Sequence, residues 1–474
     1  MYASFAQRVI RLGTPLSGAS SRWERMLGNL NTGSENALVI GAGIAGIQAA
    51  LDIAQAGFKV FLVEREPAIG GHMAQLDKTF PTLDCSACIL TPKTVEVARH
   101  RNVELMTYSE VVSVAGGPGA FRVNVRKKPR FIDIDVCTGC GLCAEACRMR
   151  GRIPDEFNVG LGKRAPTYVP FPQAVPLKYT IDKDTCLFLT RGVCGKELLC
   201  KNACEAGAIN FDQTEEEVEL QVGAIVVATG FDPFDARRKP ELGYGVYDNV
   251  ITGMEFERLA SASGPTKGEI VVKGNTPSDV VFIQCVGSRD KQVGNAYCSR
   301  VCCMYTAKQA HLIHEKLPHA NVTVLYMDIR AFGKGFEEFY DRVRTEGALY
   351  RRSNPSEVIR RGDKLIVRAE DTLLGKPIEL PADLVVLAVG MESRSDSKAI
   401  SEMLGVQHDG FFVEANAKID PVGTDRDGIY LAGCCQGPKD IPDTVAHAKA
   451  AASAAIIQLA RSRSRGQQIA APAS

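Results

Sequence analysis

A strand, turn, helix and strand near the N-terminus constrain the fold of this chain more than any other feature. The segment ALVIGAGIAG begins at Ala37 and joins an apolar run to a glycine-rich turn and the start of a helix. We expect the helix to continue through QAALDIAQAG and to stop at Gly57, and KVFLVE, from Lys59 to Glu64, is typical of a second strand. Buried strands that alternate with helices favour a parallel sheet covered on both faces. The chain is therefore expected to be an α/β protein.

The turn itself has the spacing G-x-G-x-x-G and predicts a dinucleotide site. Gly41 permits the tight turn, Gly43 lets the backbone approach a pyrophosphate, and Gly46 lets the helix pack closely on the strand. The amino end of the helix supplies backbone donors and a positive dipole end for the phosphates. Glu64 ends the second strand, where its carboxylate can accept both ribose hydroxyls and repel a 2′-phosphate.

Three further segments indicate that the dinucleotide is FAD. VEREPAIGG, which ends at Gly71, VVATG, which ends at Gly230, and GIYLAG, which ends at Gly433, resemble elements of thioredoxin-reductase-like flavoproteins with two dinucleotide domains. The helix after GIYLAG would point its amino end at the flavin pyrimidine and stabilise negative charge there. A second strand, helix and strand unit begins with DVVFIQC at Asp279, so we expect two Rossmann-like domains.

Cysteines in the middle of the chain predict iron–sulfur clusters. The chain has 16 cysteines in 474 residues, which is too sparse for a disulfide scaffold. One run has the bacterial ferredoxin spacing C-x2-C-x2-C-x3-C, and a second run has longer loops, C-x7-C-x5-C-x3-C. The fourth cysteine of such a run usually binds the other cluster. Swapped pairing would give one cluster Cys137, Cys140, Cys143 and Cys204 and the other Cys147, Cys186, Cys194 and Cys200. Zinc is the alternative, although such dense spacing is not usual for it.

A third cysteine set stands where a nicotinamide domain would carry its own glycine fingerprint. After the strand from Asp279 the turn has no G-x-G-x-x-G, and Cys285, Cys298, Cys302 and Cys303 follow instead. We interpret this set as a cluster that replaces nicotinamide as the redox partner of the flavin. Neighbouring side chains on a helix diverge by about 100°, so the helix must begin at or after the adjacent pair. The alternative is buried thiols plus a disulfide.

Two cysteine pairs remain, and the overall composition excludes some partners. Cys85 and Cys88 form a C-x2-C pair that fits a redox dithiol, part of a cluster or a packed turn. Cys434 and Cys435 are expected to pack close to the isoalloxazine. The net charge of +1 gives no reason to expect nucleic-acid binding. We find neither a secretory signal nor an apolar stretch long enough to span a bilayer, and the cysteine usage favours the cytoplasm.

These features divide the chain into segments. An inserted α+β ferredoxin domain of the bacterial two-cluster type is expected between two antiparallel strands of the first domain, FRVNV and EVELQV. The expected division is an N-terminal arm, 1–36, FAD domain, 37–130, ferredoxin insertion, 131–211, FAD domain continued, 212–265, nicotinamide-domain-like unit carrying a cluster, 266–390, the last part of the FAD domain, 391–460, and a disordered basic tail, 461–474. The arm is interpreted as an ordered tail or partner-binding helix, with a transit peptide as the alternative.

The third cysteine set, together with GGHMAQLDKTFP, LDCSACILTPK and GCCQGPKDIPDTVAHA, resembles the A subunit of heterodisulfide reductase. The resemblance runs from about Ala37 to Ala460. It implies one FAD, a two-cluster ferredoxin insertion and an unusually ligated cluster near the flavin, hence three [4Fe–4S] clusters. It also implies that Gln436, Lys439 and Asp440 belong to the flavin site. In that family the flavin-binding polypeptide passes electrons to the C and B subunits, and in some complexes its flavin bifurcates electron pairs.

The resemblance leaves several functions open. The chain shows no C-terminal ferredoxin domain after the flavin helix, which puts ferredoxin reduction and bifurcation in doubt. A hydrogenase, a formate dehydrogenase or a membrane-linked protein is a further candidate partner for electron delivery, and the last would make the protein peripheral to a membrane complex. The alternatives are the flavin subunit of a quinone-interacting or sulfur-oxidising complex of the same type, and a stand-alone NAD(P)H-dependent flavoprotein. A disulfide reductase that uses Cys85 and Cys88 directly is a further interpretation.

Overall fold

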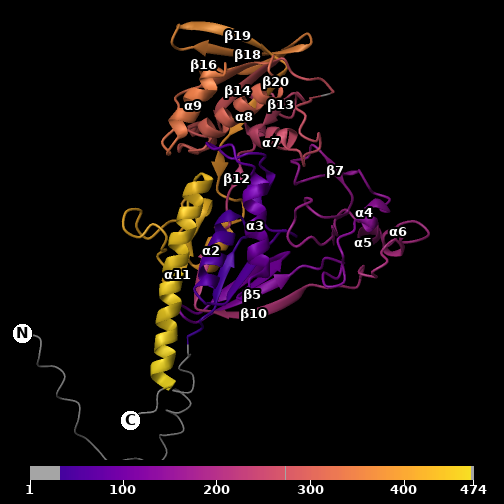
Figure 1. The fold of residues 1–474 in the computed structure, drawn as a ribbon, viewed down its shortest axis with the longest axis vertical. Coiled ribbons are helices and arrows are strands. Elements are labelled where there is room, and N and C mark those ends of the chain that lie inside the picture. Colours follow the sequence, from indigo (N-terminus) through magenta and orange to yellow (C-terminus); the bar gives the residue numbers. More distant parts are fainter. Residues whose placement is uncertain (1–32, 273, 471–474) are drawn as a thin grey trace, which may run out of the picture.

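The structure is a computed structural model that describes residues 33–272 and 274–470, with side chains as far as Ser464. Two units, each built on a parallel sheet, lie one above the other in Figure 1, and an excursion of the chain with α4, α5 and α6 projects to one side. The expected arm falls mostly on residues 1–32, and the last residues of the expected tail are 471–474, so these parts lie outside the described residues.

The first unit has a five-stranded parallel sheet in the order β22-β11-β1-β2-β3. Its strands are β1 (Ala37–Ile40), β2 (Val60–Glu64), β3 (Val103–Thr107), β11 (Ala224–Val227) and β22 (Ile429–Leu431). Its helices are α2 (Ile44–Gln55), α3 (Ser86–Arg99) and α11 (Ile441–Ala470), with short turns η1 (Gly71–Gln75) and η5 (Gly433–Cys435). The residues of β1 and β11 are all buried because helices and a second sheet cover both faces.

An antiparallel sheet, β10-β5-β4, packs on this unit and is the base of the excursion. Its strands are β4 (Ser109–Ala115), β5 (Phe121–Lys127) and β10 (Glu216–Val222). Lys127 pairs with Glu216 and Phe121 with Val222, so everything between β5 and β10 leaves and returns at one end of this sheet. The two alternating segments thus pair as expected. The excursion contains α4 (Leu142–Glu145), β6 (Ile153–Pro154), β7 (Lys163–Arg164), β8 (Thr167–Tyr168), β9 (Thr180–Ile181), α5 (Leu187–Arg191) and α6 (Leu199–Asn202).

The second unit repeats this plan with the parallel sheet β13-β20-β14-β15-β16 and the antiparallel sheet β17-β18-β19. Its elements are β13 (Val250–Thr252), α7 (Gly253–Ala260), β14 (Asp279–Val286), α8 (Cys302–Lys316), β15 (Asn321–Tyr326), α9 (Phe336–Thr345), β16 (Leu349–Arg352), β17 (Glu357–Arg361), β18 (Lys364–Asp371), β19 (Lys376–Ala382) and β20 (Leu384–Val389). The two-stranded ladder of β12 (Asp232–Pro233) and β21 (Met391–Glu392) links the units. The remaining elements are η2 (Ala236–Arg238), η3 (Pro240–Leu242), η4 (Lys291–Val293) and α10 (Ser397–Leu404).

The expectation of disorder after Arg461 is wrong for the described part, because α11 continues to Ala470. Contacts with the first unit explain the longer helix. Ser462 is 6% exposed, and the Arg463 Nε lies 2.7 Å from the Glu35 Oε2 while its guanidinium covers the Phe58 ring. A buried serine and a cation–π contact stabilise a segment whose composition alone looked like a solvated tail. Among the described residues, no helix is both long and apolar enough to cross a membrane.

Candidate functional site

A cavity of about 990 Å³ is lined by residues of both units and gathers most of the predicted flavin-binding residues. A volume of this size is at the upper end of the range for cofactor sites. The predicted residues that line it are Gly41, Gly43, Glu64, Gly71, Gly230, Lys439 and Asp440. The lining leaves out Gly46, Gly433 and Gln436, whose places are described below.

The glycine turn has the geometry that a pyrophosphate requires. Gly41 has φ +97°, and a Cβ on it would lie 2.5 Å from the Ala228 carbonyl oxygen. A Cβ on Gly46 would lie 1.8 Å from the Gly41 oxygen, so this glycine is needed where helix and strand touch. A Cβ on Gly43, in contrast, would meet only the Gly71 Cα at 4.0 Å, so this position faces open cavity at the start of α2. A phosphate can approach the backbone there.

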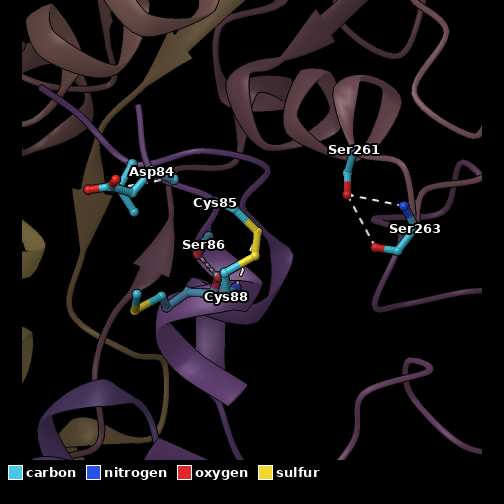
Figure 2. Close-up of a disulfide and its surroundings, with 8 residues drawn as sticks. Asp84, Cys85, Ser86, Cys88, Ser261 and Ser263 are labelled. Carbon is cyan, nitrogen blue, oxygen red and sulfur yellow. Dashed lines mark hydrogen bonds between the residues drawn. A yellow bond between two sulfur atoms is a disulfide. The ribbon is translucent and has the colours of Figure 1, made fainter. Parts of the chain in front are cut away.

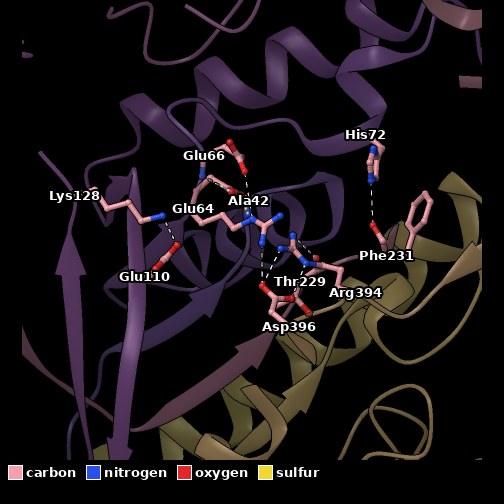
Figure 3. Close-up of polar contacts among 11 residues, drawn as sticks. Ala42, Glu64, Glu66, His72, Glu110, Lys128, Thr229, Phe231, Arg394 and Asp396 are labelled. Carbon is pink, nitrogen blue, oxygen red and sulfur yellow. Dashed lines mark hydrogen bonds and ion pairs between the residues drawn. The ribbon is translucent and has the colours of Figure 1, made fainter. Parts of the chain in front are cut away.

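Glu64 is held in place by the backbone of the same turn (Figure 3). One carboxylate oxygen accepts the Ala42 N–H at 2.7 Å and the other accepts the Glu66 N–H at 3.0 Å. Burial raises the pKa of the Glu64 carboxyl, and the two backbone donors act against that shift. A carboxylate has about four acceptor positions, so both oxygens can still accept hydroxyl hydrogens from a ribose.

The amino end of α11 closes the other end of the cavity. The Asp440 carboxylate accepts the Asp443 N–H at 2.8 Å and so caps the helix. Lys439 lines the cavity, and its Nζ donates to the Gln436 side chain, while the Gln436 amide donates to Glu414 at 2.7 Å. Gln436 therefore positions Lys439 and does not face the cavity itself. Burial lowers the pKa of the Lys439 ammonium.

Gly433 and the neighbouring cysteines form the short turn that precedes this helix. Gly433 has φ +74°, and a Cβ there would lie 2.8 Å from the Ala45 Cβ, so it permits close packing on α2. Both cysteines of this turn are buried. Cys434 lines the cavity, while Cys435 belongs to the core beneath the sheet. The expected packing of this pair near a flavin thus fits Cys434 better than Cys435.

Two polar groups at the cavity were not singled out from the sequence. Arg394 donates to Asp396 at 2.9 Å, and Arg65 donates to the same carboxylate at 3.0 Å, which ties the end of β2 to the segment before α10 (Figure 3). Lys308 and Glu257 also line the cavity and form an ion pair at 2.8 Å in which each side chain is 2% exposed. No motif contains these residues, and only the charges in otherwise buried helices could have pointed to the second pair.

The eight cysteines of the excursion fall into two groups of neighbours. Burial raises the pKa of Cys143 to about 12, and repulsion from Cys137, Cys204 and Cys140 adds to this shift. In the other group, burial raises the pKa of Cys200 to about 11, with further contributions from Cys147, Cys186 and Cys194. The pKa of Cys147 is raised in the same way by burial and then by Cys186 and Cys194. The fourth cysteine of each run therefore lies with the other run.

The third set is also brought together, at the junction of β14 and α8. Burial raises the pKa of Cys302 well above its ordinary value, and Cys285, Cys303 and Cys298 contribute in that order. Cys302 is the first residue of α8, so the adjacent pair occupies the first turn, as expected. Cys285 has φ +60°, which is rare for a residue other than glycine. Such strain in a set of four neighbouring cysteines, two of them buried, points to a function of the site.

An aromatic ring packs on the turn where a nicotinamide domain would hold its phosphates. Gly287 is the glycine of the turn after β14, and a Cβ on it would lie 2.1 Å from the Phe234 ring. The space that the missing side chain of Gly287 leaves is therefore filled by the Phe234 ring. The cysteine set instead adjoins the cavity. Both the Tyr305 hydroxyl and the Cys302 thiol donate to the carbonyl of Val389, at 2.8 and 3.8 Å, and Tyr305 and Val389 line the cavity.

A single metal ion does not have a ready site in the part of the chain that the structure describes. No three His, Cys, Asp or Glu side chains there are arranged to share one ion. A [4Fe–4S] cubane takes one cysteine for each iron, so its ligands surround a larger group. The remaining pair, Cys85 and Cys88, forms a disulfide at the start of α3 (Figure 2).

The two units with parallel sheets, the glycine turn and the cavity that both units line define a flavoprotein with two dinucleotide-type domains. The residues of the cavity fit FAD. A family model described as pyridine nucleotide-disulphide oxidoreductase matches residues 190–454, and one described as FAD dependent oxidoreductase matches residues 36–84. The chain belongs to the pyridine nucleotide-disulphide oxidoreductase family.

Curated relatives support the resemblance to the A subunit of heterodisulfide reductase. The chain is 53% identical over 433 residues to the A subunit of the H(2):CoB-CoM heterodisulfide,ferredoxin reductase of Methanothermobacter thermautotrophicus, covering 90% of this chain and 64% of that protein. It is 53% identical over 442 residues to the iron-sulfur A subunit of the CoB--CoM heterodisulfide reductase of Methanocaldococcus jannaschii, covering 92% and 66%. The chain thus spans just under two thirds of these relatives. A thioredoxin reductase of T. acidophilum aligns with 91% of this chain and 99% of its own, at 15% identity and a TM-score of 0.49.

Proposed function

We propose that this chain is the FAD- and iron–sulfur-containing electron-transfer component of a complex of the heterodisulfide reductase type. It relays electrons between a flavin in the cavity and three [4Fe–4S] clusters. The observation that carries the proposal is the set of Cys285, Cys298, Cys302 and Cys303, which adjoins the cavity at the place of a nicotinamide turn. When bound, FAD supplies a carrier that exchanges electrons in pairs or singly.

The residues around the cavity have separate tasks in this relay. The turn from Gly41 to Gly46 and the carboxylate of Glu64 bind the dinucleotide and orient it. The amino end of α11 would place its positive dipole end toward a bound flavin, where it would stabilise the negative charge of the reduced form. Val389 and Tyr305 form the wall shared by the cavity and the cysteine set, so they would lie between the flavin and the cluster.

The excursion supplies the other two cluster sites in the proposal. Cys137, Cys140, Cys143 and Cys204 would hold one cluster, and Cys147, Cys186, Cys194 and Cys200 the other. Support comes from the neighbours of Cys143 and Cys200, which follow the swapped pairing of a bacterial two-cluster ferredoxin domain. Buried thiols that repel one another are stabilised as thiolates when iron binds them.

The partners in the proposal are the B and C subunits of the same type of complex, in the cytoplasm. Relatives are named for dihydrogen, formate and ferredoxin, which supports a hydrogenase- or formate-dehydrogenase-linked protein as the proposed electron donor. A membrane-linked donor is the other candidate in the proposal. Quinone-interacting and sulfur-oxidising complexes share this kind of flavin subunit, and the proteins that copurify from the native source distinguish them. A stand-alone NAD(P)H flavoprotein is disfavoured because Phe234 occupies the space beside Gly287.

Anaerobic mixing with electron donors tests the proposal. We expect NADH and NADPH to leave the flavin absorbance near 450 nm unchanged over minutes, since no cradle holds the nicotinamide phosphates. A reduced low-potential viologen, which donates single electrons to exposed clusters, should bleach both the cluster and the flavin absorbance. Rapid and stoichiometric bleaching of the flavin by either nicotinamide would contradict the proposal.

A further inference from the structure

The disulfide between Cys85 and Cys88 lies at the amino end of helix α3 (Figure 2). Both residues are exposed. Cys85 is the N-cap of the 14-residue helix α3, and its sulfur accepts the Cys88 N–H at 3.2 Å. The pair is therefore a C-x2-C group that solvent molecules can reach.

The disulfide is separate from the flavin cavity. Lys78, Thr79 and Phe80 line the cavity, whereas neither cysteine does. Lys78 pairs with Cys85 in an isolated bridge, and the Thr79 N–H donates to the Asp84 carbonyl at 2.8 Å. A loop thus stands between the cavity and the sulfur atoms. Neither sulfur atom therefore borders the space in which a flavin would bind.

The turn that carries the two cysteines is held independently of their bond. Ser86 is fully buried, its hydroxyl donates to the Met73 carbonyl at 2.7 Å, and its N–H donates to the Asp77 carbonyl at 3.0 Å. Breaking the disulfide leaves these contacts in place. The thiols then stay at the amino end of α3, where the helix dipole and a backbone donor stabilise a thiolate at Cys85.

An apolar residue next to the pair offers a contact for a reaction partner. Ile89 follows Cys88 and is 42% exposed. We propose that Cys85 and Cys88 are a thiol–disulfide exchange site that reacts with external dithiols, separately from the flavin and the clusters. The proposal does not rest on the proposed function.

The exchange is balanced by the external dithiol. One donor thiolate attacks the Cys85 sulfur, a mixed disulfide forms and Cys88 leaves as a thiolate, which takes up a proton. The second donor thiol then displaces Cys85, so the donor ends as a disulfide and the protein pair as two thiols. Two electrons and two protons pass to the protein, and in the reverse direction the Cys85 thiolate is the attacking group.

Mass spectrometry of the complete protein with its cofactors tests the exchange. The native protein is held anaerobically in mixtures of reduced and oxidised dithiothreitol, quenched with an alkylating agent and digested with trypsin. The fragment 79–93 contains these two cysteines and no others. We expect it to change from disulfide to doubly alkylated in one two-electron step. The fragment 427–439, with the buried Cys434 and Cys435, is the internal control and should react at least tenfold more slowly.

Two single variants test the roles of the sulfurs. Cys88→Ser leaves Cys85 alone at the helix end, and it should form a mixed disulfide with oxidised glutathione about tenfold faster than Cys88 does in Cys85→Ser. Iron content should be unchanged in both. The proposal is overturned if fragment 79–93 is reduced only after unfolding, if the two variants react equally, or if either variant loses iron, which would make the pair cluster ligands.

Discussion

Replacing Glu64 by glutamine isolates the contribution of one acceptor oxygen to dinucleotide binding. Both oxygens accept backbone N–H groups, from Ala42 at 2.7 Å and from Glu66 at 3.0 Å. A glutamine has one oxygen and one NH2 group, so one of the two backbone donors then faces another donor. A hydrogen bond to a charged group contributes about 1.5–3 kcal/mol. Because bound FAD would exclude water from this donor, the loss should appear in the dissociation constant as a rise of about 10- to 150-fold.

The assay is titration of the apoprotein with FAD, followed by the quenching of flavin fluorescence. Glu66→Gln is the matched control, because Glu66 borders the same cavity but its side chain is 61% exposed. We expect the control to bind FAD within about twofold of the original protein, since exposed charges contribute little. Glu64→Arg should remove FAD altogether while the iron content stays unchanged. An unaltered dissociation constant in Glu64→Gln would refute the assignment of this strand end to the ribose.

Other consequences of the structure can be measured separately. Gly43→Ala should prevent FAD binding without lowering the unfolding temperature, because the added methyl group enters open cavity, whereas Gly46→Ala should destabilise the fold, as its Cβ would lie 1.8 Å from a carbonyl oxygen. Lys308→Met should reduce the free energy of unfolding by about 3–5 kcal/mol by leaving the buried Glu257 carboxylate without its cation, and Glu257→Gln in the same chain should recover at least half. Iron analysis of anaerobically purified protein should give about 12 atoms per chain, and a value near eight would remove one cluster from the account.

Local patterns in the sequence were enough to predict the first unit. The glycine spacing from Gly41 to Gly46 and the buried strands around it depend on contacts between near neighbours, and the structure has them where expected. The adjacent Cys302 and Cys303 also predicted where α8 begins. These features depend on residues that are close together in the chain, so the local sequence is enough to predict them.

Contacts between distant segments could not be predicted in the same way. Arg394 and Asp396 reach the cavity from a loop with no motif, and Phe234 fills the space beside Gly287 from a segment far along the chain. The extension of α11 depends on Arg463 meeting Glu35 and Phe58 at the other end of the sequence. In each case the local structure depends on a residue far away in the chain, and the composition of a segment does not show which distant residue it will contact.

Electron transfer in Cys302→Ser tests most directly whether a cluster stands in place of a nicotinamide site. The variant removes one thiol from the set beside Val389, and Cys434→Ser, at a buried cysteine that lines the cavity, is the matched control. After photoreduction of the flavin, stopped-flow absorbance follows its reoxidation together with bleaching of the clusters. The account predicts full FAD, about four fewer iron atoms and transfer slowed at least tenfold in Cys302→Ser, with the control unchanged. Full iron and unchanged transfer in Cys302→Ser would contradict it.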